Sequence, residues 1–256
     1  MQRAPVGAGA SGHPTPRLIV PFDRASTPRR DFLTRVATTA AVVVAGSACA
    51  TPLAAANAVN ATEPGRSRRA PKFDDSWTSR VRAAAHRAVF DSPDIADGLA
   101  LEHATVFMDN YHEQFGTSDA DTVPVIVMRH QGTVLALGDA MWEKYELGAN
   151  AKLKDPTTGE VTTRNPFVRV VASDKHGLVE PGSTLPALQA RGAVLLVCNR
   201  ALNFFAGVQA KKRNLQKDDV MNDFLNGLVP GVIVQPSGVY AVLRAQEAGC
   251  AVMRST

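Results

Sequence analysis

Four short apolar runs, each followed by turn-forming residues, constrain most strongly what this 256-residue chain can form. They cover residues 86–93, 123–132, 192–199 and 231–238, and a fifth, shorter run spans 250–254. Because these runs do not alternate with polar residues, both faces of each strand must be covered, as in a parallel sheet. Helical patterns lie between them at 95–115, 133–148, 200–212, around 221–228 and at 239–249. This order predicts an α/β fold: a three-layer α/β/α sandwich around a mostly parallel five-stranded sheet.

One connection is longer than such a fold needs. Residues 149–186 are polar and rich in Pro, Gly and charged side chains. They form either an insertion loop or an ordered excursion from the domain. To cover a small-molecule site, this segment would have to reach the carboxyl ends of the strands. The chain order predicts instead that it leaves from the opposite edge.

The N-terminal region has the pattern of an export signal. Arg29 and Arg30 lie in the sequence STPRRDFL, and an uncharged run of 15 residues, 36–50, follows them. That run is shorter than the ~20 apolar residues of a membrane helix, so we expect no membrane span. The sequence resembles a twin-arginine signal, and small residues that suit cleavage follow it. We therefore interpret residues 1–58 as a removable twin-arginine signal peptide and expect a periplasmic or secreted protein.

The leader also accounts for the positive charge of the chain. The protein has 28 basic and 24 acidic residues, and residues 1–58 contain six of the basic and two of the acidic ones. The remainder has 22 of each, which argues against nucleic-acid binding. Residues 59–80 contain little to bury and are predicted to be a flexible tether. Residues 81–256 are long enough for one domain with its own core.

The strand ends indicate where a site would lie. In an open parallel sheet, ligands bind at the carboxyl ends of the strands, where helix N-termini converge. The side chains that the sequence places there are Asp91, Arg129, His130, Cys198, Asn199 and Ser237. A thiol at a helix N-terminus near histidine or arginine ionises more readily, because positive potential favours the thiolate. Cys198 is therefore the candidate catalytic residue, and the other five are its possible neighbours.

Simpler roles remain open for most of these residues. Cys198 could be a small buried side chain that fills a gap in the core. His130 could be a polar loop residue or a hydrogen-bond anchor rather than a base. Asp91, together with Ser92, is expected to cap the first helix, and Ser237 could cap the last one.

Several kinds of site lack support in the sequence. It contains no G-x-G-x-x-G, no Walker loop, no G-x-S-x-G, no paired C-x-x-C and no histidine spacing typical of zinc. We therefore expect neither a metal nor a cofactor.

The C-terminal half resembles a known family. The sequence LPALQARGAVLLVCNRAL, followed by LVPGVIVQPSGVYAVLRAQEAGCAVM, is similar to the DsrE-like group of sulfur-relay proteins. The resemblance extends back through HRAVFDSPD and VPVIVMRHQG. It implies a three-layer α/β protein that is often oligomeric, and a persulfide-carrying cysteine at the position of Cys198.

Two functional hypotheses follow. The first is an exported DsrE-like protein that handles sulfane sulfur through Cys198, a sulfurtransferase-like carrier with a sulfur-donor or sulfur-acceptor protein as partner. The alternative is a non-catalytic binding or assembly module of the same fold. In either case Cys198 and Cys250 are predicted to stay unpaired. They belong to opposite ends of parallel strands, roughly 17 to 20 Å apart, too far for a disulfide.

Overall fold

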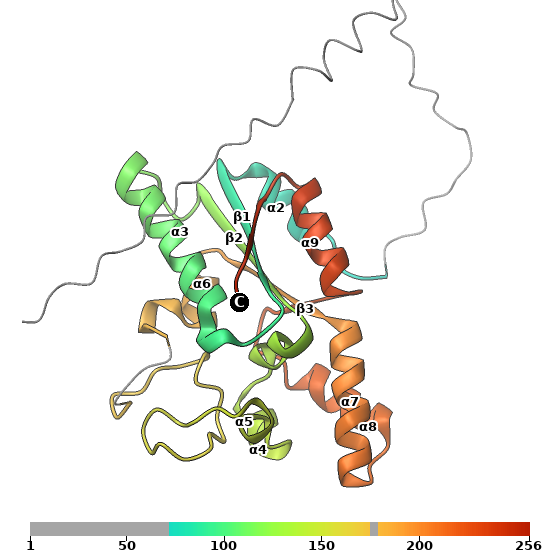
Figure 1. The fold of residues 1–256 in the computed structure, drawn as a ribbon. Coiled ribbons are helices and arrows are strands. Elements are labelled where there is room, and N and C mark those ends of the chain that lie inside the picture. Colours follow the sequence, from blue (N-terminus) through green and yellow to red (C-terminus); the bar gives the residue numbers. More distant parts are fainter. Residues whose placement is uncertain (1–71, 175–178) are drawn as a thin grey trace, which may run out of the picture. The chain divides into compact units, whose positions relative to one another are not determined.

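A five-stranded, all-parallel sheet forms the centre of the structure (Figure 1). The computed structural model describes residues 72–174 and 179–256, so the predicted leader and most of the predicted tether lie outside it. The strands are β1 (His86–Ser92), β2 (Thr122–Met128), β3 (Val194–Cys198), β4 (Ile233–Gln235) and β5 (Ala251–Arg254). Their order is β4-β3-β2-β1-β5, and every neighbouring pair is parallel. The expected α/β fold and its five strands are confirmed.

Helices connect the strands and cover the sheet on both faces. The α-helices are α2 (Trp77–Ala83), α3 (Leu99–Phe115), α4 (Asp139–Lys144), α5 (Leu147–Ala151), α6 (Leu185–Ala190), α7 (Asn199–Arg213), α8 (Lys217–Asn226) and α9 (Gly238–Glu247). Short 3₁₀ helices are η1 (Ala96–Gly98), η2 (His130–Ala136) and η3 (Pro181–Ser183). None of the helices in the described ranges is long and apolar enough to cross a bilayer.

The core consists of two apolar clusters, one on each face of the sheet. Along β2, Val123, Val125 and Val127 belong to the cluster under α2 and α9. Ile126 and Met128 point to the other face and join side chains of α3, α6 and α7. Figure 1 shows α3 and α6 on one side of the sheet and α9 on the other. Because both faces are buried, the strands read as continuous apolar runs.

The ordered domain begins earlier than the sequence suggested. Helix α2 starts at Trp77, within the segment predicted as a tether. The Trp77 side chain is 4% exposed and packs in the cluster with α9. Just before the helix, Asp75 forms an ion pair with Arg244 of α9. The tether therefore cannot extend to residue 80, because one tryptophan and one carboxylate already attach this part of the chain to the domain.

The helix predicted over 133–148 is wrong as a single element. The chain forms η2, becomes extended at Leu137 and Gly138, and then forms the short helices α4 and α5. The reason is a pair of tertiary hydrogen bonds. Asn165 Nδ2 donates to the carbonyl oxygens of Leu135 and Leu137, each at 2.8 Å, which a continuous helix would use internally.

The first predicted helix also begins late. An α-helix was expected from residue 95, but α3 starts at Leu99 after a turn that ends at Gly98 with φ 84°. A β-carbon at Gly98 would lie 2.5 Å from Val179 and 2.8 Å from Phe167. Only glycine suits this turn, because the backbone is left-handed there and another segment approaches too closely for a side chain.

That other segment is the long connection 149–186, whose described parts form an ordered excursion. Arg164 bonds Asp155 at 2.7 Å and Asp174 at 2.5 Å, and all three side chains are at most 14% exposed. The segment packs against η2 and Gly98, which follow the carboxyl ends of β2 and β1. The expectation that it leaves from the opposite edge is wrong, since β2 delivers the chain to its carboxyl end before the excursion starts.

Candidate functional site

Cys198 is the last residue of β3 and caps the helix that follows. The strand Val-Leu-Leu-Val-Cys is buried along its whole length, and the Cys198 side chain ends it with 6% exposure. Its Sγ accepts a hydrogen bond from the backbone N–H of Ala201 at 3.4 Å. This contact places the sulfur at the N-terminus of the 15-residue helix α7.

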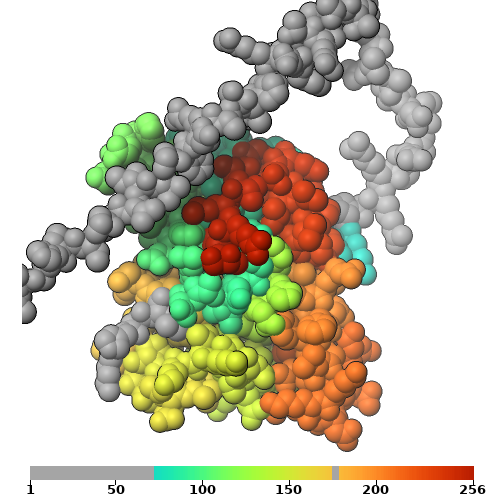
Figure 2. All heavy atoms as spheres, viewed as in Figure 1, coloured from blue at the N-terminus to red at the C-terminus, as the bar shows by residue number. Residues whose placement is uncertain are grey.

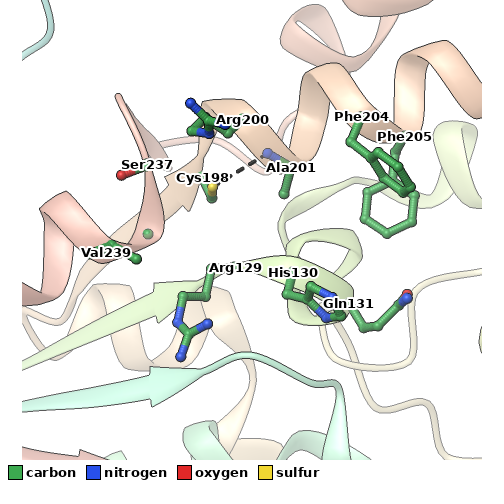
Figure 3. Close-up of a pocket in the computed structure, with 11 residues that line it drawn as sticks. Arg129, His130, Gln131, Cys198, Arg200, Ala201, Phe204, Phe205, Ser237 and Val239 are labelled. Carbon is green, nitrogen blue, oxygen red and sulfur yellow. Dashed lines mark hydrogen bonds between the residues drawn. The ribbon is translucent and has the colours of Figure 1, made fainter.

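A cavity of about 260 Å³ opens at Cys198 (Figure 3). Its wall includes Arg129, His130, Cys198 and Ser237, which come from the ends of three strands. Four of the six residues expected to form a site thus line one cavity. Physically, this follows from the parallel sheet, which brings the carboxyl ends of β2, β3 and β4 to the same edge.

Arg129 is held by a carboxylate next to the cavity. Its Nε and Nη2 donate to the two carboxylate oxygens of Asp91 at 2.6 and 2.7 Å. The hydrogen bond to Asp91 raises the pKa of Arg129, and charge on Cys198 adds to the rise against the opposing effect of burial. A β-carbon on Gly238 would come 2.3 Å from Arg129 Cβ, so the arginine stem packs against the start of α9. Asp91 therefore positions Arg129 and cancels much of its charge.

His130 follows Arg129 with a left-handed backbone, φ 49°. Its side chain is exposed on the cavity wall and forms no hydrogen bond with another described residue. The role of hydrogen-bond anchor, one of those expected from the sequence, receives no support. Histidine adopts positive φ more readily than most residues, and residues held in such conformations cluster at functional sites.

Two residues that were expected beside Cys198 make other contacts. Asn199 accepts a hydrogen bond from Asn203 on its own helix and is not part of the cavity wall. Asp91 does not cap the first helix, and neither does Ser92, whose Oγ donates to the Asp94 carbonyl at 2.8 Å. The turn at 93–98 separates them from α3.

The cap predicted at the last helix is confirmed. Ser237 Oγ accepts from the backbone N–H of Tyr240 at 3.1 Å. This satisfies one free donor in the first turn of α9 and fixes the edge of the cavity. The serine therefore has a structural role beside its place in the wall.

Four further residues of the cavity wall were not predicted from the sequence. Arg200 and Phe204 line the cavity, four residues apart on one face of α7, together with Phe205 and Val239. Phe204 is 65% exposed and its ring meets that of Phe205 edge-on, with 5.7 Å between centroids. The sequence did contain a signal for them. Arg200 and Phe204 have i, i+4 spacing, which puts them on one face of the helix that starts at the strand-end cysteine.

Cys250 has a different environment. It lies in the apolar cluster under α9, just before β5 starts, and is 8% exposed. Burial raises its pKa to about 11, against a lowering effect of Arg87. Both described cysteines are free, which confirms the prediction that they do not pair.

The described residues show no metal cluster: nowhere in 72–174 or 179–256 do three His, Cys, Asp or Glu side chains gather as ligands. No described residue of 149–186 lines the cavity. Comparison with known proteins adds no assignment, since no family model and no curated protein matches the chain.

Proposed function

We propose that this protein is an exported, DsrE-like sulfur carrier that holds sulfane sulfur on Cys198 as a persulfide. The observation that carries the proposal is that Cys198, alone among the described cysteines, lines a cavity at the carboxyl edge of the sheet. A thiolate attacks a sulfane sulfur, the bond to the donor breaks, and the donor leaves with the electron pair. The products are a cysteine persulfide and a donor shortened by one sulfur atom.

Persulfide formation tests this proposal directly. Purified protein treated with inorganic polysulfide is expected to gain about 32 Da on the peptide that contains Cys198. Cys198→Ser should lose the adduct, and Cys250→Ser should keep it. Wild-type protein with no adduct on Cys198, from polysulfide or from the organic donors described below, would contradict the carrier function and leave the competing hypothesis, a non-catalytic binding or assembly module.

Partners and assembly belong to the same proposal. A carrier needs a donor and an acceptor of sulfur, and the resemblance favours protein partners and a homo-oligomer. The edge strand β5 supports assembly, since all four of its residues are exposed (Figure 2). Val252 and Met253 on this strand are each 45% exposed, an apolar surface at an open edge of the sheet.

Export by the twin-arginine route can be tested separately. Changing both Arg29 and Arg30 to lysine should leave the full-length precursor inside the cell. The export machinery recognises the arginine pair itself, so lysine should not replace it, because lysine keeps the charge but lacks the guanidinium group. Cell fractionation and immunoblotting measure this, with the change of Arg17 and Arg24 to lysine as a control outside the twin-arginine motif. Normal export of the Arg29/Arg30 variant would refute the twin-arginine assignment.

A further inference from the structure

The cavity at Cys198 has one cation without a partner. Arg200 is exposed on the wall and forms no ion pair or side-chain hydrogen bond within the described residues. Arg129, by contrast, is engaged by both oxygens of Asp91. No aspartate or glutamate is among the residues found to line the cavity. The free charge beside the thiol is therefore positive, and it favours an anionic ligand.

Other parts of the wall are apolar. Phe204 and Val239 are 65% and 64% exposed, on α7 and α9, and lie on either side of Cys198 in Figure 3, with Phe205 next to Phe204. In Figure 3 the two phenylalanine rings lie along α7, beyond Ala201 from Cys198. Inorganic thiosulfate or polysulfide has no apolar part to bury against these side chains. A ligand that covers them needs an organic body.

This inference rests on the proposed function. We propose that the sulfur donor is a small organic thiosulfonate, R–SO₂–S⁻, with an apolar group R. The Cys198 thiolate attacks the terminal sulfur, and the S–SO₂R bond breaks. The electron pair leaves with the sulfinate R–SO₂⁻, and the cysteine becomes the persulfide Cys198–S–S⁻. Two negative charges enter and two leave, and no oxidant or reductant is needed because the sulfinate takes the electron pair of the broken S–S bond.

Each part of the wall has a role in this step. The thiolate and the donor are both anions and repel each other, and Arg200 offsets that repulsion while it binds the sulfonyl oxygens. The apolar group R packs against Phe204 and Phe205, whose rings lie together on α7, which orients the terminal sulfur toward Cys198. Arg200 and Phe204 lie one helical turn apart, which suits a head group and a body that are joined by one bond.

A matched pair of donors tests the role of the apolar group. Benzenethiosulfonate and methanethiosulfonate share the same anionic head and differ in R. The rate of the 32 Da gain on Cys198 is measured by mass spectrometry for each donor. It is divided by the rate of that donor with free cysteine to remove intrinsic reactivity. We expect wild-type protein to prefer benzenethiosulfonate by at least about tenfold. Phe204→Ala should remove most of the preference, and Phe115→Ala, an exposed phenylalanine on α3, should not.

The charge is tested on the same reaction. Arg200→Gln should slow sulfur uptake from benzenethiosulfonate by about tenfold, and Arg200→Lys should recover most of the rate. Lys211→Gln, which removes a charge from the far end of α7, should have no effect. Equal rates in wild type and Arg200→Gln would overturn the role of Arg200 as the anion-binding residue.

Treatment with inorganic polysulfide separates the two proposals. Uptake from polysulfide without any preference between the organic donors would overturn the thiosulfonate class and leave the carrier function standing. No uptake on Cys198 from any of the three donors would overturn both.

Discussion

Replacing Asn165 with alanine is expected to lower the free energy of unfolding by about 3 to 5 kcal/mol. The side chain is fully buried and donates to the carbonyls of Leu135 and Leu137 at 2.8 Å each. Its Oδ1 also accepts from the backbone N–H of Phe167 at 3.0 Å. Alanine would leave three buried backbone groups without partners, and each such group costs about 1 to 3 kcal/mol.

Urea denaturation followed by circular dichroism measures this change. The control is Asn150→Ala, which removes an exposed asparagine with a single hydrogen bond of 3.3 Å to the Tyr145 carbonyl. It should cost less than about 0.5 kcal/mol. A loss below about 1 kcal/mol for Asn165→Ala would show that η2 and the excursion 149–186 do not depend on this side chain.

The second large effect concerns thiol reactivity. Under native conditions Cys198 is expected to react with iodoacetamide at least about tenfold faster than Cys250. With a pKa of about 11, Cys250 has roughly one thiolate per three thousand molecules at pH 7.5. It also lies within an apolar cluster, whereas Cys198 lines the cavity from which a reagent can approach.

Timed alkylation with peptide mapping measures both rates in one sample. Raising the pH toward 11 should speed the reaction of Cys250 as its thiolate forms, which provides an internal control. Equal protection of both thiols would remove the main reason to regard Cys198 as functional. A disulfide-linked peptide pair of Cys198 and Cys250 would contradict the parallel placement of β5.

Local patterns were sufficient to predict the sheet and part of the site. Five apolar runs became five parallel strands, because continuous apolar character demands cover on both faces. Once the strands are parallel, their carboxyl ends must share an edge, and Arg129, His130, Cys198 and Ser237 meet there. The cap at Ser237 was predictable for the same reason, since an N-cap depends on a serine and the few residues that follow it.

Contacts between distant segments decided the rest. The helix expected over 133–148 breaks because Asn165 donates hydrogen bonds to two of its carbonyl oxygens. These carbonyls belong to residues at least 28 positions away in sequence. Asp91 binds Arg129 across 38 residues instead of capping a helix. Helix α2 is ordered because Trp77 is buried with α9, far along the chain. Periodicity and capping report only on neighbours in sequence. A hydrogen bond or burial between remote segments can outweigh these local preferences, and its partners become known only when the chain has folded.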